Sequence, residues 1–293
     1  MRITIFLILL LSVQSLNITA QSSDNSLIRI ALVADIQYAD QQKSGTRFYR
    51  QSLTKTDSMI DVLNNEELSY IVDLGDRIDR DYKSYVAIEN ILAKSEHQVI
   101  FIPGNHDFVV DNKDKKLINS KTGDKRGYHS SSQENWHFVF LNGMKQSMEA
   151  YPKNSFPFMK AKKELSRLKE AGAVNAYDWN GGLGKKQTAW LLAEAKFAHD
   201  NDLNLMIFCH QPIFPGNAHS LWNYQSLTEE LKDFQGELWW ISGHDHKGGF
   251  GVHHGINMFT MHGMVEGEGS SFGILEIMKD SVRLIGYGDQ PDL

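Results

Sequence analysis

The sequence predicts an α/β fold, in which short buried strands alternate with amphipathic helices. Near-continuous apolar runs of strand length recur from residue 27 onward, as in strands covered on both faces. Stretches with helical spacing of apolar residues separate these runs. The composition is that of an ordinary globular chain, with 41% hydrophobic and 23% charged residues. Alternation of this kind is typical of an α/β architecture.

The strands are expected in chain order at residues 27–34, 70–74, 99–102, 136–141, 203–209, 238–241, 258–261, 272–277 and 282–287. Turns rich in glycine and charge separate the last three, which predicts antiparallel hairpins that close a sheet. Helices are expected through Leu53 to Leu63, through Tyr85 to Leu92, over 161–171 and over 187–201.

Two segments have a loop-like composition. Residues 111–126 are rich in lysine and lack periodicity, which predicts a solvated loop. The run Gly-Gly-Leu-Gly-Lys at 181–185 invites comparison with a phosphate-binding loop. However, Trp179 stands where that motif needs its first glycine, and Lys186 stands where it needs Ser or Thr. These glycines are therefore expected to form a turn before the following helix.

Charge and cysteine content limit the class of protein. The 30 basic and 36 acidic residues give a net charge of −6, which argues against a long nucleic acid as partner. A small phosphate-bearing substrate remains compatible with this charge. The single cysteine, Cys209, allows neither an intrachain disulfide nor a cysteine-based metal site, and its apolar surroundings predict a buried core residue.

The N-terminus has the pattern of a secretory signal peptide. Arg2 precedes an apolar stretch over residues 3–11, and a polar stretch then leads to Thr19-Ala20-Gln21. The apolar stretch is too short to span a membrane, which takes ~20 apolar residues. We expect cleavage after Ala20 and export to the periplasm or medium without a stable membrane anchor; an uncleaved anchor is the alternative. The remainder, residues 27–293, is expected to form one domain.

Polar residues follow five of the expected strands at the point where each strand ends. Any one of them has an ordinary explanation, as a turn residue, a helix cap or a hydrogen-bonded histidine. Ligands bind beyond the carboxyl ends of strands in open α/β sheets. Donors at five strand ends, with glycine at three of the turns, therefore predict a metal site. The seven candidate donors are Asp35, Gln37, Asp76, Asn105, His210, His244 and His246, and His106 follows Asn105 directly in the same turn.

The donor types indicate which metals the site prefers. Carboxylate, amide and imidazole groups without thiolate suit Mn, Fe or Zn. Seven donors are too many for one ion and suit two ions that share a bridging carboxylate. Paired ions can bind a phosphoryl oxygen, lower the pKa of a bound water and stabilise both oxygens of an in-line displacement.

The series Asp35-x-Gln37, Gly75-Asp76, Gly104-Asn105-His106-Asp107, His210 and Gly243-His244-x-His246 resembles the motifs of calcineurin-like metallophosphoesterases. The resemblance implies a four-layer α-β-β-α sandwich of two mixed sheets flanked by helices. It also implies a dinuclear centre with a bridging hydroxide as nucleophile. Asp35, Gln37, Asp76 and His246 would hold one ion, and Asp76, Asn105, His210 and His244 the other. His106 would protonate or stabilise the leaving oxygen.

Most members of that superfamily have histidine where Gln37 stands. A Gln carbonyl is a harder donor than imidazole and favours Mn²⁺ or Mg²⁺ over Zn²⁺. Several segments resemble the manganese-dependent ADP-ribose/CDP-alcohol diphosphatases. They are Asp-Ile-Gln-Tyr-Ala-Asp at 35–40, Arg-Phe-Tyr-Arg at 47–50, Asn-Gly-Gly at 180–182, Trp-Asn-Tyr at 222–224, Gly-Gly at 248–249 and the C-terminal glycine-rich hairpin region.

This narrower resemblance implies two divalent metal ions. Mn²⁺ is the expected metal, and Fe and Zn are the alternatives. The implied substrate is a nucleoside diphosphate linked to a sugar or alcohol. A broader phosphodiesterase or phosphomonoesterase of the same superfamily is the alternative within enzymes. A metal-stabilised binding protein without catalysis is the alternative outside them. The remaining histidines His253, His254 and His262 are expected to support the site from outside or to be structural.

Overall fold

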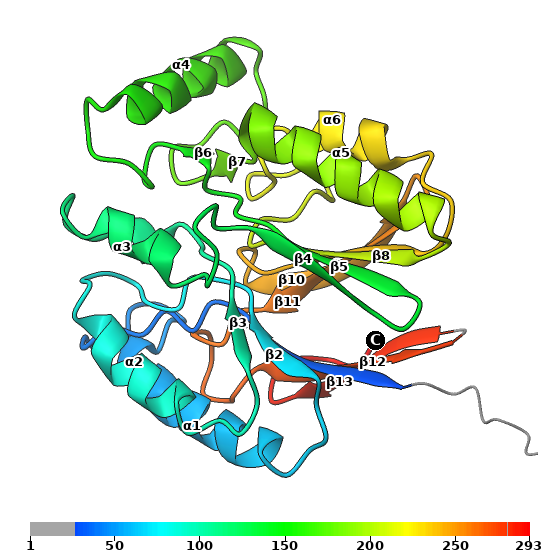
Figure 1. Cartoon of the computed structure of the whole chain (residues 1–293). Coiled ribbons are helices and arrows are strands. Elements are labelled where there is room, and N and C mark those ends of the chain that lie inside the picture. Colours follow the sequence, from blue (N-terminus) through cyan, green and yellow to red (C-terminus); the bar gives the residue numbers. More distant parts are fainter. Residues whose placement is uncertain (1–26, 280) are drawn as a thin grey trace, which may run out of the picture.

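Two β-sheets pack face to face, and helices cover their outer faces, so the chain forms four layers α-β-β-α (Figure 1). The computed structural model describes residues 27–279 and 281–293. The predicted signal peptide over residues 1–20 lies outside this part of the chain. The layered architecture confirms the predicted fold class.

The first sheet has five strands in the order β13-β12-β1-β2-β3. Strands β1, β2 and β3 run parallel to one another, so their carboxyl ends meet at one edge of the sheet. Strand β12 is antiparallel to both β1 and β13. The elements of this half are β1 (Ile28–Val33), α1 (Ser52–Leu63), β2 (Tyr70–Asp73), α2 (Ser84–Leu92), β3 (Val99–Phe101), β12 (Phe272–Met278) and β13 (Ser281–Tyr287).

The second sheet has six strands in the order β10-β11-β9-β8-β5-β4. Its four inner strands β5, β8, β9 and β11 are parallel, and an antiparallel strand lies at each edge. The elements of this half are β4 (His129–Gln133), β5 (Trp136–Phe140), α5 (Gly184–Asp200), β8 (Asn204–Phe208), α6 (Tyr224–Leu231), β9 (Leu238–Ser242), β10 (Lys247–His253) and β11 (Ile256–His262).

Burial on both faces explains why the inner strands have continuous apolar sequences. In β1, Ile30 and Leu32 pack between the two sheets with Phe138 and other large side chains. The alternate residues Ala31 and Val33 belong to the cluster under α1 and α2. Since successive side chains of a strand point to opposite faces, a strand in a middle layer must be apolar at every position.

The structure corrects several expected elements. Among the last three strands, β12 and β13 form the expected hairpin. Strand β11 does not form a hairpin with β12, because it lies in the other sheet beside β9. The lysine-rich segment, expected as a loop, contains a short helix, α3 (Lys115–Ser120). Its one buried residue is Ile118, so the sequence shows no helical spacing of apolar residues there. The half-exposed, serine-rich edge strand β4 was likewise not predicted.

The region between β5 and α5 is also more structured than expected. Helix α4 (Phe156–Glu170) begins five residues before the expected position 161. Ser155 caps its N-terminus by accepting a hydrogen bond from the Phe158 backbone N–H. The glycines at 181–182 form strand β7 (Gly181–Gly182), which pairs with β6 (Gln146–Ser147), and α5 begins at Gly184. In the described residues, no helix is both long and apolar enough to cross a membrane.

Candidate metal centre

The candidate donors lie at the carboxyl ends of parallel strands from both sheets. In the first sheet, β1 leads into Asp35 and Gln37, β2 into Asp76 and β3 into Asn105. In the second sheet, β8 leads into His210, and β9 leads into His244 and His246. The structure brings all seven together across the gap between the two sheets.

One group of donors surrounds His246. Its Nε2 lies 3.3 Å from Asp35 Oδ1 and 3.0 Å from Gln37 Nε2. Gln37 Nε2 also lies 3.4 Å from Asp76 Oδ2. Gln37 Oε1 is buried and has no hydrogen-bond partner among the described residues, and buried Asp35 Oδ1 has none apart from its contact with His246 Nε2. Buried polar atoms are normally satisfied, so these two oxygens fit a site that binds a cation.

A second group surrounds His210. Its Nε2 lies 3.3 Å from both Asp76 Oδ2 and Asn105 Oδ1, and 3.0 Å from His244 Nδ1. Asp76, His210 and His244 each offer a ligand atom, and these three atoms lie within 4.8 Å of one another. Asp76 belongs to both groups, which is the position that a bridging carboxylate needs.

Each histidine of the site has its second ring nitrogen beside a hydrogen-bond acceptor. His210 Nδ1 lies 2.8 Å from the Leu74 carbonyl, and His244 Nε2 lies 2.9 Å from Asn180 Oδ1. His246 Nδ1 lies 2.6 Å from Glu266 Oε1. These acceptors need N–H groups, so in the neutral rings the nitrogens that face the site carry lone pairs. Orientation of this kind is usual for histidines that bind metals.

The pKa values of the histidines also favour a bound cation at this site. Burial lowers the pKa of His210, but the Asp76 carboxylate outweighs this effect and raises the pKa to about 9. Burial and the charge of His210 hold the pKa of His244 well below its usual value. The metal-free chain thus keeps a proton on one of two histidines whose nitrogens face each other, where a metal ion could replace it.

The backbone at the donors adopts a conformation that side chains usually avoid. Nine non-glycine residues of the described chain have positive φ, and four of them are donors. Such backbone costs roughly 1–3 kcal/mol per residue and is concentrated at functional sites. The four are Asp35 (φ 53°), Gln37 (φ 44°), Asp76 (φ 55°) and His244 (φ 70°).

The glycines next to the donors allow the loops to approach closely. A Cβ on Gly75 would lie 2.7 Å from the Gly104 nitrogen and 2.8 Å from His210 Nδ1. A Cβ on Gly243 would lie 2.8 Å from Asp35 Oδ2. Larger residues at these two positions would therefore push the donors apart.

Asp107 fixes the loops without facing the cleft. Its carboxylate accepts hydrogen bonds from the backbone N–H groups of Asp76 (2.9 Å), Arg77 (3.0 Å) and Gly104 (2.8 Å), and from the Tyr85 hydroxyl (2.7 Å). One buried side chain thereby ties the strand end that carries Asp76 to the loop that carries Asn105.

His106 lies beside the donors in a cleft of about 310 Å³. Its Nδ1 lies 3.0 Å from Asp79 Oδ1, and its backbone N–H donates to Asp76 Oδ1 at 2.7 Å. Burial lowers its pKa, but Asp76 and Asp79 outweigh burial and raise the pKa to about 9. The ring is therefore positioned and charged as a proton donor would be.

Sequence reasoning missed several residues of the site. Asn180, Glu266 and Asp79 hold the second nitrogens of His244, His246 and His106, and Trp179 and His219 line the cleft. Asn180 lies in the Asn-Gly-Gly segment singled out by resemblance, but no sequence pattern pairs these acceptors with their histidines.

The three other histidines singled out in the sequence, His253, His254 and His262, are not part of the cleft lining. His253 stacks on Phe214 and contacts His254, and the His262 ring packs against Gly248. Cys209 is buried as predicted, and burial raises the pKa of its thiol to about 12.

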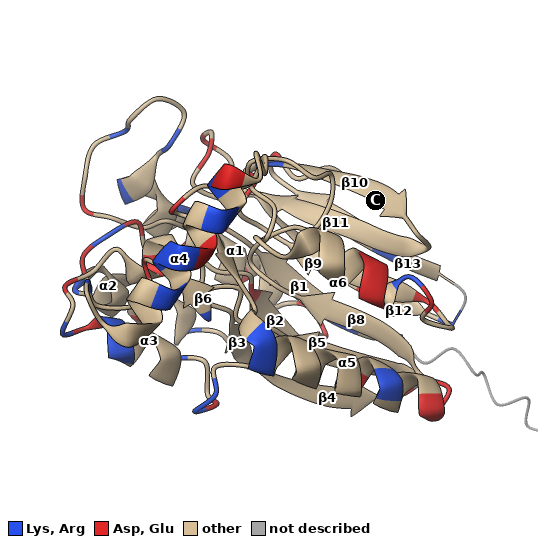
Figure 2. Ribbon diagram, turned by 90° about the horizontal axis from the view of Figure 1, so that it is seen from above, with Lys and Arg blue, Asp and Glu red and all other residues tan. Residues whose placement is uncertain are grey.

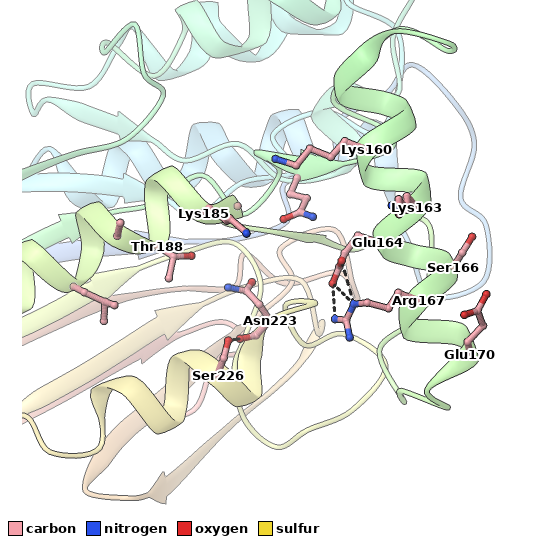
Figure 3. Close-up of a pocket in the computed structure, with 14 residues that line it drawn as sticks. Lys160, Lys163, Glu164, Ser166, Arg167, Glu170, Lys185, Thr188, Asn223 and Ser226 are labelled. Atoms are coloured by element: carbon pink, nitrogen blue, oxygen red, sulfur yellow. Dashed lines mark hydrogen bonds and ion pairs between the residues drawn. The ribbon is translucent and has the colours of Figure 1, made fainter.

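A larger groove, of about 900 Å³, lies between α4 and α5 and includes none of the seven donors (Figure 3). Lys160, Lys163 and Lys185 line it, and Arg167 pairs with Glu164 at 2.6 Å. Helix α4 carries more basic than acidic residues (Figure 2), but Glu164 and Glu170 lie among the basic residues of the lining, so the groove has no single sign of charge.

Comparison with known proteins places this geometry in a family. The pattern of the calcineurin-like phosphoesterase family matches residues 28–248. The manganese-dependent ADP-ribose/CDP-alcohol diphosphatase of Oryza sativa is 27% identical, over 92% of this chain and 94% of its own. The protein of the same name from Bos taurus is 26% identical, with the same coverage.

A dimetal phosphatase from Danio rerio has the same fold. Its crystal structure superposes with a TM-score of 0.81, at 24% identity, over 91% of this chain and 98% of its own. The family match covers most of the chain, including every candidate donor. The chain therefore belongs to the calcineurin-like phosphoesterase family and is a metal-dependent phosphohydrolase.

Proposed function

We propose that the enzyme hydrolyses the phosphoanhydride bond of nucleoside diphosphates linked to a sugar or an alcohol. The products would be a nucleoside monophosphate and a phosphorylated partner. The observation that carries the proposal is the convergence of seven O and N donors around Asp76, with Gln37 among them. The names of the relatives from rice and cattle support this substrate class.

Two divalent ions fit the donor set, because Asp35 and Gln37 each leave a buried oxygen unpaired and three histidines are oriented by acceptors. Asp35, Gln37, Asp76 and His246 would hold one ion. Asp76, Asn105, His210 and His244 would hold the other. We propose Mn²⁺ as the working metal, because the amide oxygen of Gln37 is a hard donor.

When bound, such ions polarise a phosphoryl oxygen and supply hydroxide at neutral pH. The oxygen of water attaches to one phosphorus, the bond from that phosphorus to the bridging oxygen breaks, and the bridging oxygen leaves on the other phosphate. His106, held by Asp79, would deliver a proton to this oxygen. Proton delivery by a well-placed histidine contributes ~10²–10⁴-fold to rate where the leaving group is poor, and less where it is a phosphate.

A substrate panel tests the proposal. The protein is stripped with a chelator, reloaded with Mn, Mg, Fe or Zn, and assayed on ADP-ribose, CDP-choline, bis(p-nitrophenyl) phosphate and AMP. We expect the highest kcat/KM on the two diphosphates with Mn²⁺. Faster turnover of the diester or of AMP would instead indicate a broader phosphodiesterase or phosphomonoesterase. No turnover of any compound with Mn²⁺ would favour a binding protein.

We also propose that the enzyme acts after export. The support is the signal-peptide pattern that ends near Ala20. N-terminal sequencing of the mature protein from fractionated cells should give Gln21 as the first residue, in the exported fraction. Full-length protein retained in the cytosol would contradict export.

A further inference from the structure

Glu149 is a carboxylate in the wall of the cleft with one buried oxygen that has no partner in the described part of the chain. Its Oε2 is buried, and no group in the described residues donates a hydrogen bond to it. Burial raises the pKa of Glu149 to about 7, although the charge of His106 lowers it. An unpaired buried carboxylate costs stability, and departures from full satisfaction are expected at functional sites. Glu149 is therefore suited to a donor that comes from outside the chain.

A second cavity, of about 560 Å³, adjoins the cleft at Glu149. Both hollows share Val109 and Glu149 in their linings. Three exposed aspartates, Asp81, Asp111 and Asp178, line the second cavity further out. The acceptors of this cavity thus begin beside the candidate metal centre and continue outward.

Lys115 does not neutralise this lining through an ion pair with Glu149. Its Nζ donates to the carbonyl oxygens of Phe108 (3.0 Å) and Glu149. These bonds connect the two walls of the cavity at a fixed separation. Besides Lys115 only Lys153 is basic in the lining, against four carboxylates. An additional anionic group is therefore disfavoured here, whereas a cation or a neutral group is compatible with this charge. The unpaired Glu149 Oε2 needs a hydrogen-bond donor, which favours a group rich in hydroxyls.

The cavity adjoins the cleft beside the turn that carries His106. The 3-10 turn η2 (His106–Phe108) carries His106 in the cleft lining and Phe108 in the lining of the second cavity. If His106 delivers the proton to the departing oxygen, the group attached to that oxygen extends past His106. Its path leads to Glu149 and the second cavity.

We propose that this cavity binds the departing half of the substrate by its sugar or polyol hydroxyls, with Glu149 as a principal acceptor. The proposal rests on the function proposed above and makes it more specific. Water's oxygen would end on the nucleoside monophosphate, and the bridging oxygen would leave on the sugar or polyol phosphate with the proton from His106.

The chemistry of the departing group gives a direct test. A hydroxyl can donate a hydrogen bond to a carboxylate oxygen, whereas the trimethylammonium group of choline has no N–H to donate. CDP-glycerol and CDP-choline share the nucleotide and the scissile bond, and they differ only in this half. Losing a hydrogen bond to a charged group lowers affinity about tenfold or more, so weakening one should be measurable.

The experiment measures kcat and KM of the Mn²⁺-loaded enzyme on both compounds for wild type, E149Q and D178N. We expect E149Q to lower kcat/KM on CDP-glycerol about tenfold, mainly through KM, and to change CDP-choline by less than about twofold. D178N, an exposed substitution at the same cavity, should act in the same direction with a smaller effect. E164Q on α4, away from both hollows, is the matched control and should change neither substrate.

Equal losses on both substrates, or a larger loss on CDP-choline, would overturn hydroxyl recognition, and no loss on either would remove Glu149 from binding. Hydrolysis of CDP-glycerol in H₂¹⁸O should place the label in CMP; label in glycerol phosphate would make the nucleotide the departing half and overturn the proposal. Wild-type enzyme that cleaves neither compound would instead refute the proposed function itself.

Discussion

His244 Nε2 lies 2.9 Å from Asn180 Oδ1, and this contact determines which nitrogen of His244 faces the candidate metal centre. The Asn180 Nδ2 donates to the carbonyl oxygens of Asn175 (3.0 Å) and Ala218 (2.5 Å). Exchanging the nitrogen and oxygen of this amide would lose both hydrogen bonds. Its Oδ1 is thus the acceptor, His244 Nε2 is the donor, and His244 Nδ1 is left free to bind a cation.

Removing this acceptor should weaken metal binding. N180A should lower Mn²⁺ affinity about 10–100-fold, the usual effect of losing a partner that orients a metal-binding histidine. N180D loses the same two amide N–H bonds but keeps an acceptor for His244, so its affinity should remain near wild type. Titration calorimetry on chelator-stripped protein measures both variants. Equal affinities for N180A and N180D would mean that the contact does not orient His244.

Gln37 should set the preference between metals. In Q37H an imidazole nitrogen replaces the amide oxygen, which should raise the ratio of activity with Zn²⁺ to activity with Mn²⁺. Q37E keeps a hard oxygen donor and should retain the preference for Mn²⁺. Both variants are assayed after chelator stripping and reloading with one metal. An unchanged ratio in Q37H would show that residue 37 does not bind an ion.

His106 should matter more for a poor leaving group. A phosphate leaving group is already stable, so H106A should lower the rate less on ADP-ribose than on an alkyl phosphodiester. The full effect of a general acid, ~10²–10⁴-fold, is expected only on the diester. Single-turnover rates on the two substrates give the comparison. Equal losses on both would show that His106 is not the leaving-group acid.

Lys55 should stabilise the loop that carries Glu266. Its buried Nζ donates to the carbonyl oxygens of Met264 (2.6 Å), Glu266 (3.0 Å) and Gly267 (2.9 Å). K55M keeps the apolar stem but leaves these carbonyls unpaired, so the free energy of unfolding should fall by about 3 kcal/mol. K94M breaks only the exposed pair with Asp57 and should cost under about 1 kcal/mol. Urea unfolding measures both, and similar losses would contradict a special role for Lys55.

Glu149 should make stability depend on pH. Because burial raises its pKa from 4.5 to about 7, the folded state holds the proton more tightly than the unfolded state does. This stabilisation is full below pH 4.5 and is lost as the pH rises through 7. E149Q has no such group, so it should be more stable than wild type at pH 8 and similar at pH 4.5. Urea unfolding in EDTA tests this, and a difference independent of pH would contradict it.

The sequence identified the candidate donors because the end of a strand can be recognised from neighbouring residues. An apolar run such as 27–34 ends where polar residues begin, and parallel strands bring their carboxyl ends to a common edge. Asp35, Asp76, His210 and His244 could therefore be assigned to one site without coordinates. The chemical type of each donor also limited the metals that the site would prefer.

The pairing of strands could not be read in the same way. Strands β11 and β12 both have buried, apolar sequences, and nothing in either sequence says which sheet it joins. The structure places them in different sheets, because β11 adds to β9 while β12 adds to β1. Helix α3 could not be predicted either, because it buries a single residue, Ile118, and one apolar position cannot show helical periodicity.

By itself, then, the sequence determined the fold class and the seven candidate donors, since strand periodicity and strand ends depend on neighbouring residues. Only the tertiary structure decided that Asn180 faces His244, that Glu266 faces His246, and that Glu149 joins the cleft to a second cavity. These three residues lie on connecting segments, whose positions follow from the packing of distant elements. Their contacts span the chain and leave no local pattern in the sequence.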